Sequence, residues 1–294
     1  MSGRETKTKS TRDVKKSAEW RGAAGAQGFY VYCVGERDAL APLFDGELPG
    51  AIEGESGLEM VGAGLAAVVS RVPLAEYGEG ALAARLADAA WTATRALRHE
   101  RVVEHFAARA AVVPLRFGTI YLRGESVERM LEERGAQLRS VLRRLEGREE
   151  WGLNVFVERA RLREEVAHVS ERLREMGERA DASSPGQAYL LRKKIESLRD
   201  EEARAETRRV ASEVEDTLNA ASDGAARLRV LKDEAAEQGE LAARFAFLVA
   251  RDSFNEFRAA AERLAEEYTP LGFRFELTGP WPAYNFTGGS SGAR

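Results

Sequence analysis

The residues that could support chemistry include a glycine pattern near the end of the first quarter of the chain. Residues 62–67, Gly-Ala-Gly-Leu-Ala-Ala, match Gly-x-Gly-x-x-Ala, in which backbone N–H groups at a helix start hold the pyrophosphate of a dinucleotide. Such a site needs a long helix directly after the glycines. Residues 68–73 are instead Val-Val-Ser-Arg-Val-Pro, a short β-branched run that ends in proline. The pattern therefore predicts a hairpin turn between two strands and no cofactor.

The histidines and the cysteine do not form a metal-binding or nucleophilic set. His99 and His105 are six residues apart, so on a helix they point about 240° apart, whereas two ligands on one face need a spacing of three or four. His168 has no nearby Cys or His. The single cysteine, Cys33, lies inside an apolar run, where a buried structural thiol is expected. We therefore expect no metal site and no catalytic residue.

The composition indicates a folded protein without a nucleic-acid or membrane partner. Hydrophobic residues make up 44% of the chain and charged residues 31%, which is a globular mixture. The net charge of -4 gives no global positive field to hold a phosphate backbone. No stretch has the roughly 18 uninterrupted apolar residues of a membrane-spanning helix, and the N-terminus has no apolar core of a secretory signal. A single cysteine suits a reducing compartment, so we expect a cytoplasmic protein.

Strand-like and helix-like segments alternate in the first half of the chain. The strand-like segments are rich in β-branched and aromatic residues, and they cover residues 29–34, 58–61, 65–72 and 111–118. Apolar residues at helical spacing predict helices over 80–109, with a possible break near His99, and over 126–145. Residues 40–57, rich in Gly and Pro, predict a loop. Strands interleaved with two helices predict an α+β sandwich of the ferredoxin-like kind.

The second half opens with a strand over 151–157, and its main feature is a pair of long helices. In the first helix, apolar residues repeat at spacings of 4, 3, 4 and 3, which is a heptad seam; they are Leu162, Val166, Val169, Leu173 and Met176. The Ser-Ser-Pro-Gly sequence at 183–186 breaks the chain, and a second helix is expected over 186–222. Two long helices joined by a short break predict an antiparallel coiled-coil hairpin.

The remainder returns to the pattern of the first half. We expect strands over 227–231 and 244–250, an amphipathic helix over 253–268 capped by Ser253, and a final strand over 273–277. This half therefore also reads as α+β, with the hairpin inserted after its first strand.

These elements predict two folded domains between two flexible ends. Residues 1–27 carry seven Lys or Arg against three Asp or Glu and few large apolar residues, so they predict a disordered basic arm. The first, ferredoxin-like domain is expected over 28–148 and the second, α+β domain over 149–286, with its hairpin over 159–222. Residues 287–294 predict a flexible tail. The fold class is α+β.

Four segments of the chain carry specific motifs. They are Tyr-Val-Tyr-Cys-Val at 30–34, Pro-Leu-Arg-Phe-Gly-Thr at 114–119, Glu-Trp-Gly-Leu-Asn-Val at 150–155, and Gly-Phe-Arg-Phe-Glu-Leu-Thr-Gly-Pro-Trp-Pro-Ala-Tyr-Asn-Phe at 272–286. Together they resemble the GvpL/GvpF family of gas vesicle proteins. The last segment is the most specific. The resemblance covers roughly residues 28–286, and it implies a modified ferredoxin-like domain followed by an α+β domain with a coiled-coil pair.

The resemblance also implies a function in the assembly of gas-filled protein shells. Members of this family bind the small hydrophobic shell protein GvpA and other gas vesicle accessory proteins, and no enzymatic activity is attributed to them. The expected location is therefore the cytoplasm and the gas vesicle, and the F-type and L-type roles both stay open. Two other classes also stay open: an enzyme that uses a nucleotide or another small molecule in a ferredoxin-like domain, and a generic protein scaffold.

Five residues of the resembling segments are candidates for partner contact. They are Arg116, Phe117, Tyr121, Trp281 and Tyr284. Large aromatic residues and Arg dominate the energetics of protein interfaces, which favours a contact role. The same residue types also pack in cores, and Pro280 and Pro282 would stiffen the strand exit beside Trp281. A structural role for these residues is therefore the alternative.

Overall fold

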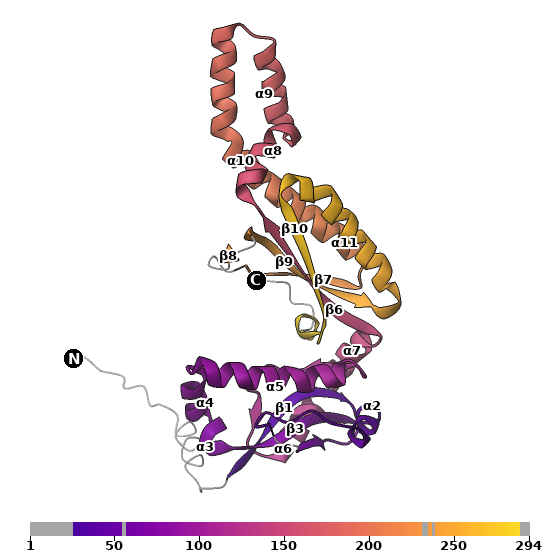
Figure 1. Ribbon diagram of the computed structural model, residues 1–294. Coiled ribbons are helices and arrows are strands. Elements are labelled where there is room, and N and C mark those ends of the chain that lie inside the picture. Colours follow the sequence, from indigo (N-terminus) through magenta and orange to yellow (C-terminus); the bar gives the residue numbers. More distant parts are fainter. Residues whose placement is uncertain (1–25, 55–56, 231–234, 237–238, 289–294) are drawn as a thin grey trace, which may run out of the picture. The chain divides into compact units, whose positions relative to one another are not determined.

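A computed structural model of the chain describes residues 26–54, 57–230, 235–236 and 239–288. The chain divides into two compact units, Met1–Phe106 with Leu115–Gly135, and Ala107–Pro114 with Ala136–Arg294 (Figure 1). Each unit contains an antiparallel sheet with helices, so the predicted α+β class is confirmed. Most of the predicted basic arm and tail, residues 1–25 and 289–294, lie outside the described residues.

The first sheet has the order β2-β3-β1-β4, and β5 also pairs with β1. Its strands are β1 Gln27–Glu36, β2 Leu58–Val61, β3 Leu65–Pro73, β4 Val112–Pro114 and β5 Ile120–Tyr121. Eight consecutive residues of β1, from Gly28 to Gly35, are buried, so both faces of the sheet are covered. Helix α5, Ala89–Ala107, contacts one face through His99, and α6, Gly124–Glu133, begins against Phe29 on the other.

The predicted hairpin turn at Gly62 is confirmed, since β2 and β3 pair in antiparallel register on either side of it. Gly62 has a φ of +116°, a left-handed backbone conformation that favours glycine. A Cβ atom at Gly62 would lie 2.3 Å from the carbonyl oxygen of Leu65 and 2.6 Å from Cδ1 of Leu131. The glycine pattern thus serves a close turn packed against α6, and no helix follows it to receive a dinucleotide.

Gly62→Ala should therefore destabilise the protein by about 2 kcal/mol or more, because it adds both backbone strain and a collision with backbone atoms. Gly80→Ala provides the matched control, since Gly80 lies in helix α4, Glu79–Leu86, and a Cβ atom there would meet nothing within 4 Å. That change should stabilise by about 0.5–1 kcal/mol. Urea unfolding of both variants would check the opposite signs, and equal effects would contradict the turn assignment.

Two helix predictions in the first half need correction. The predicted helix over 80–109 is interrupted near Asp88 and not near His99, because the Asp88 side chain accepts hydrogen bonds from the N–H groups of Ala90 and Trp91 at 3.0 and 3.1 Å and starts α5 there. The predicted helix over 126–145 is two helices, α6 and α7 Gly135–Leu145, which meet at Arg134.

The predicted loop over 40–57 is partly helical. A short helix α2, Arg37–Leu40, leads directly into the 3-10 helix η1, Ala41–Asp45, and Pro in the first turn suits that start. A further short helix, α3 Leu74–Tyr77, follows β3.

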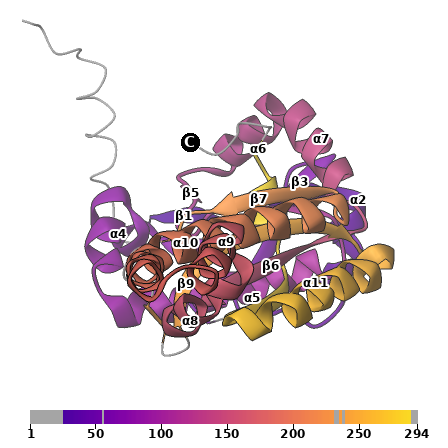
Figure 2. The ribbon, with the colours of Figure 1, turned by 90° about the horizontal axis from the view of Figure 1, so that it is seen from above.

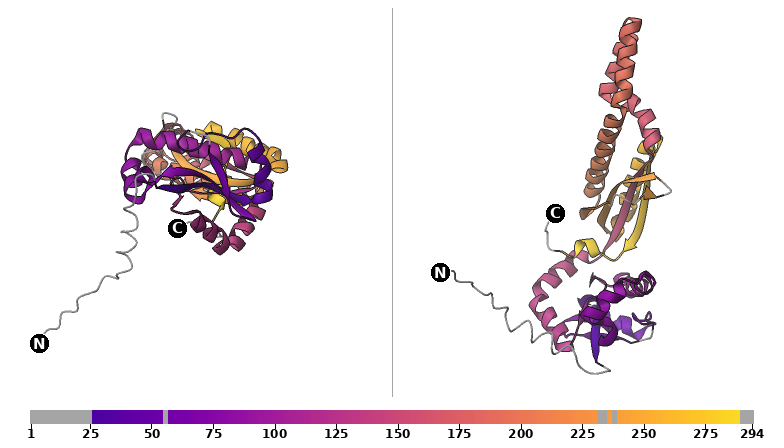
Figure 3. Two further views of the ribbon diagram at one scale, coloured as in Figure 1. Left: turned by 90° about the horizontal axis from the view of Figure 1, so that it is seen from below. Right: turned by 90° about the vertical axis from the view of Figure 1, so that its left-hand side faces the viewer.

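The second sheet has the order β10-β6-β9-β7, and β8 also pairs with β9. Its strands are β6 Arg148–Val157, β7 Gly224–Leu228, β8 Ala235–Ala236, β9 Gly239–Ala250 and β10 Phe273–Trp281. Helices α10, Pro185–Ala220, and α11, Phe254–Tyr268, cover one face of it, as the right-hand view of Figure 3 shows. The core between sheet and helices contains Phe245, Phe247 and Phe257, each fully buried.

The predicted strand bounds in this half are short or displaced. Strand β7 lies three residues before the predicted 227–231, while β9 and β10 extend beyond 244–250 and 273–277. Ser253 occupies the N-cap position of α11, but its hydroxyl forms no capping hydrogen bond, so the predicted cap is wrong. The stacking of Phe254 on Trp151, with ring centroids 4.1 Å apart, fixes this helix start instead.

The predicted heptad seam does not run through one helix. The chain bends at Ser170 between α8, Arg159–Val169, and α9, Glu171–Asp181. The hydroxyl of Ser170 accepts from the N–H of Leu173 and donates to Oε2 of Glu202 at 2.7 Å, so the break is held on both sides. Val169 is 41% exposed as a result. Both α8 and α9 pack against α10, and Figure 2 looks nearly along the axes of α9 and α10.

Candidate binding surfaces

The loop between β4 and β5 is held in place by a buried hydrogen-bond network. The Tyr30 hydroxyl accepts from the N–H of Gly118 at 3.0 Å and lies 3.0 Å from Nδ1 of His99. Nε2 of His99 lies 3.2 Å from the carbonyl oxygen of Leu115. The neutral tautomer with a proton on Nε2 satisfies all these contacts, with Tyr30 donating to Nδ1. The loop that contains the Pro-Leu-Arg-Phe-Gly segment is therefore fixed at both ends.

Burial controls the protonation of this network. Tyr30, Tyr32 and His99 have no exposed surface. Burial raises the pKa of Tyr30 above its usual range and raises that of Tyr32 to about 12, although hydrogen bonds from Gly118 and Ser70 oppose the two shifts. Burial also lowers the pKa of His99 to about 4. All three side chains are neutral at pH 7, so they act as fixed hydrogen-bonding groups and not as acid or base catalysts.

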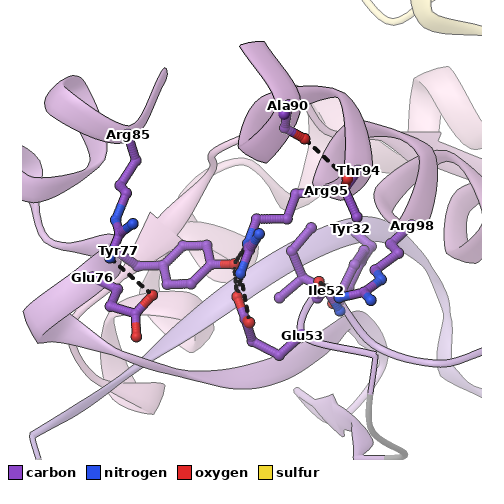
Figure 4. A network of polar contacts seen from close by, with 10 residues as sticks. All are labelled: Tyr32, Ile52, Glu53, Glu76, Tyr77, Arg85, Ala90, Thr94, Arg95 and Arg98. Atoms are coloured by element: carbon purple, nitrogen blue, oxygen red, sulfur yellow. Dashed lines mark hydrogen bonds and ion pairs between the residues drawn. The ribbon is translucent and has the colours of Figure 1, made fainter. Parts of the chain in front are cut away.

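A second polar network fixes the segment before β2 to α5 (Figure 4). Arg95 forms a two-point ion pair with Glu53, with nitrogen to oxygen distances of 3.0 and 2.8 Å, and Tyr77 donates a hydrogen bond to the same carboxylate. The main chain of Ile52 is held at both ends, because its N–H donates to the Tyr32 hydroxyl at 2.8 Å and its carbonyl accepts from Arg98 at 3.2 Å. Ile52 and Glu53 are therefore fixed to β1 and α5.

The hydrogen bonds around Glu53 keep the Glu53 carboxylate ionised. Burial pushes the pKa of Glu53 upward, but the hydrogen bonds from Arg95 and Tyr77 outweigh it, so the pKa lies below its usual value. The guanidinium of Arg95 also lies 4.3 Å from the centre of the Trp91 ring. The Glu53 carboxylate therefore forms an internal ion pair, and Glu53, Arg95 and Tyr77 have a structural role.

The candidates in the first unit differ in their exposure. Arg116 is exposed, whereas Phe117 is partly buried and packs edge-on against the rings of Tyr30 and His99, 6.3 and 5.8 Å away. Tyr121 lies in β5 opposite Phe29 and is partly buried. The neighbouring Leu122, which the sequence analysis did not single out, is 50% exposed. Arg116 therefore lies in the loop between β4 and β5, and Tyr121 and Leu122 lie in and directly after β5, which pairs with β1 as β4 does. Phe117 supports the loop through its packing on Tyr30 and His99.

The candidates in the second unit follow β10. Trp281 is 47% exposed, and its Nε1 donates to Oγ1 of Thr278 at 3.2 Å. Tyr284 is partly buried in the 3-10 helix η4, Tyr284–Phe286. Because the five candidates belong to different units, they form two candidate surfaces, defined by Arg116, Tyr121 and Leu122 and by Trp281 and Tyr284.

A buried carboxylate holds the segment that contains Trp281 and Tyr284. Oε1 and Oε2 of Glu150 accept hydrogen bonds from Nδ2 and the backbone N–H of Asn285, at 2.6 and 3.0 Å. Glu150 is only 5% exposed, and burial raises its pKa, while the two bonds from Asn285 oppose the shift. The carbonyl of Phe286 also accepts a hydrogen bond from Arg144 of α7. These contacts link residues about 135 apart in sequence, which no local pattern could reveal.

Asn285→Ala should lower the free energy of unfolding by about 1–3 kcal/mol, because the change leaves a buried carboxylate with one donor fewer. It should also increase proteolytic cleavage after residue 281, since the segment loses its side-chain attachment. Asn255→Ala, at an exposed position in the first turn of α11, is the matched control and should change neither quantity appreciably. Limited proteolysis and urea unfolding measure both effects. An Asn285 variant with the resistance of the parent protein would contradict this role.

The described residues offer neither a metal cluster nor a membrane-spanning helix. Within the described ranges, no group of three or more His, Cys, Asp or Glu side chains could hold a metal ion. Across the same residues, no helix combines the length and apolar character needed to cross a bilayer. Cys33 is fully buried, and burial raises the pKa of its thiol, as expected for a structural cysteine.

Comparison with solved structures defines the class of fold. The crystal structure of the gas vesicle protein GvpF from Anabaena sp. PCC7120 matches with a TM-score of 0.64 and 16% sequence identity, over 91% of this chain and 99% of that one. The two-sheet α+β arrangement described above is therefore a GvpF-like fold.

Comparison of sequences then gives the family. The model of the family described as gas vesicle synthesis protein GvpL/GvpF matches residues 28–288. Gas vesicle protein L of Streptomyces sp. (strain CB03234) is 30% identical over 272 residues, which cover 88% of this chain and 92% of that protein. Gas vesicle protein F of the same strain is 29% identical over 218 residues, or 71% and 85% of the two chains. The chain belongs to the GvpL/GvpF family, and this membership implies a role in gas vesicle formation.

Proposed function

We propose that this protein assists gas vesicle formation by binding the small hydrophobic shell protein GvpA and other accessory proteins, without catalysing a reaction. The observation that supports this most directly is the family match over residues 28–288. The polar networks agree with it, because their titratable groups are committed to internal contacts that hold segments in place.

The physical need for such a protein follows from the shell subunit. A subunit that lines a gas space exposes apolar surface before assembly, and such surface aggregates unless another protein covers it. We propose that the surface defined by Arg116, Tyr121 and Leu122 contacts the shell protein. Arg116 and Leu122 are exposed and Tyr121 is partly buried, and arginine, aromatic and apolar side chains together are the composition of many binding surfaces. Trp281 and Tyr284 form a second proposed contact, for another accessory protein.

The finer features of the fold belong to this proposal. We propose that both sheets follow the ferredoxin-like plan, β-α-β-β-α-β with the fourth strand beside the first, and the orders β2-β3-β1-β4 and β10-β6-β9-β7 support it. We also propose that α9 and the first half of α10 form a coiled-coil pair that docks an accessory protein. Tyr189 and Leu190, each 65% exposed near its tip, would make that contact.

Co-expression with the shell protein tests the proposed function. The shell protein should become soluble and copurify with this chain, and the paired change Arg116→Ala and Leu122→Ala should reduce the recovered shell protein several-fold. The matched control combines Arg101→Ala and Leu97→Ala, at exposed positions of α5. An insoluble shell protein with no copurification would count against the function. Equal recovery with both double variants would reject the assigned surface alone.

A further inference from the structure

Strand β10 presents the longest open edge of the two sheets. It is nine residues long and pairs with β6 on one side only, and within the described ranges no strand pairs with its other side. The other terminal strands, β2, β4 and β7, have four, three and five residues. A long open edge is a template for pairing with another strand, and natural proteins usually shorten, charge or bend it.

The direction of the backbone groups of β10 follows from its pairing with β6. The carbonyl oxygen of Gly272 accepts from the N–H of Glu158 at 2.9 Å, so the backbone groups of Gly272 point toward β6. Because successive residues of an antiparallel strand alternate in direction, those of Arg274 and Glu276 also point toward β6. The N–H and C=O groups of Phe273, Phe275 and Leu277 therefore point outward from the sheet.

The side chains of this stretch alternate between two faces. Phe273 and Phe275 lie on the face covered by α11, where Tyr268 packs against both rings, 6.1 and 6.5 Å away. Phe275 and Leu277 are only partly buried against the core. Arg274 and Glu276 lie on the opposite face, where Arg274 covers the Phe156 ring at 4.1 Å and Glu276 accepts from Asn154 at 3.5 Å. The pairing irregularity in β10 comes only after Thr278.

From this edge we infer that a second copy of the chain pairs with β10 in antiparallel orientation, with Phe275 opposite Phe275. When two copies of residues 273–277, Phe-Arg-Phe-Glu-Leu, run antiparallel about Phe275, apolar residues face apolar residues and the basic residue faces the acidic one. In this register Arg274 lies opposite Glu276 of the second copy, and Phe273 lies opposite Leu277. All three outward-pointing residues then meet outward-pointing residues, so their backbone groups form a ladder.

Charge selects this register over its neighbours. Moving the two-fold axis to Arg274 would place two guanidinium groups opposite each other, and moving it to Glu276 would place two carboxylates opposite each other. Like charges directly opposite destabilise a sheet, whereas opposite charges stabilise it by roughly 0.2–1 kcal/mol per pair. The contact is also isologous, because each copy supplies the same patch, as a closed two-fold dimer requires. This self-association is independent of the proposed binding of shell protein.

A charge exchange between two variants tests the inference. In a pair of identical copies, Arg274→Glu places two carboxylates opposite each other at both cross-strand pairs, and Glu276→Arg places two guanidinium groups there. The dissociation constant of each variant's dimer should therefore be at least about tenfold higher than that of the parent protein. In an equal mixture of the two variants, one copy carries both carboxylates and the other carries both guanidinium groups. Both cross-strand pairs then have opposite charges, so mixed dimers should form with an affinity near that of the parent. Sedimentation equilibrium over a range of concentrations measures all three.

The controls separate pairing from folding. Arg258→Glu makes the same charge change on α11, where Arg258 forms an exposed ion pair with Glu262, and it should leave self-association unchanged. Should either single variant lose its circular dichroism signal, the double variant R274E/E276R, which restores both pairs within one chain type, decides the question by recovering parental dimerisation. A parent protein that stays monomeric up to its solubility limit would overturn the inference. Single variants that dimerise like the parent, or a mixture and a double variant that both stay monomeric, would overturn it equally.

Discussion

Replacing Tyr30 with alanine should remove about 3–5 kcal/mol from the stability of the first unit. The Tyr30 side chain has no exposed surface, and its ring lies 4.9 Å from Tyr32 and 6.2 Å from Tyr77. Truncating a buried aromatic residue costs this much through lost burial and the cavity left behind. The change also leaves the N–H of Gly118 and Nδ1 of His99 without the Tyr30 hydroxyl. The loop with Arg116 and Phe117 should therefore loosen as the unit weakens.

Tyr30→Phe separates the hydroxyl from the ring. It keeps the packing but removes a hydrogen-bonding partner from two buried polar groups, and a loss of about 1–3 kcal/mol is expected. Hydrogen exchange measured by mass spectrometry resolves the two units, which need not unfold together. Exchange should accelerate in peptides that cover β1, α5 and residues 115–119, while the core around Phe247 stays protected. Uniform acceleration through both units, or no change with either variant, would show that this hydroxyl does not hold the loop.

The sequence was most informative where one segment's own residues determine its structure. The apolar run over 29–34 predicts a buried strand because aromatic and β-branched side chains fill both faces, and β1 is buried along that length. The turn at Gly62 could be predicted because a proline-terminated β-branched run cannot continue as a helix. For Trp281 the sequence left a contact role and a core role open, and only the structure shows that it is 47% exposed at the end of β10.

Features set by distant partners were not predictable. The heptad seam through Val169 looked continuous, yet Glu202, 32 residues away, holds Ser170 at a break in the helix. Likewise, Asp88 is an ordinary acidic residue in an alanine-rich stretch until its carboxylate is seen to start α5. The attachment of Asn285 to Glu150 joins opposite ends of the second unit's sequence. Leu122 was missed because a single leucine after a short strand carries no pattern that predicts its exposure.

Acidification should destabilise the first unit through His99. Its pKa is about 4 in the folded protein, against about 6.5 for an unperturbed histidine, because burial disfavours the imidazolium. A base whose pKa is lowered by folding contributes stability that is fully present above pH 6.5 and is lost as the pH falls through about 4. The shift corresponds to a loss of about 3 kcal/mol once the pH lies below both values. A second ring proton would also compete with the hydrogen that Tyr30 donates to Nδ1.

The pH dependence of the free energy of unfolding between pH 6.5 and 4 measures this effect. His99→Gln should be less stable than the parent at pH 7, because the amide fills the buried site less well, but its stability should fall less steeply with acid. His168→Gln makes the same change of residue type at an exposed position of α8 and is the matched control for the substitution itself. If the parent and His99→Gln proteins lose stability in parallel across this interval, His99 is not the group that takes up the proton. The smaller slope of His99→Gln is expected because His99 is fully buried and its two ring nitrogens are hydrogen-bonded to the main chain of Leu115 and to Tyr30.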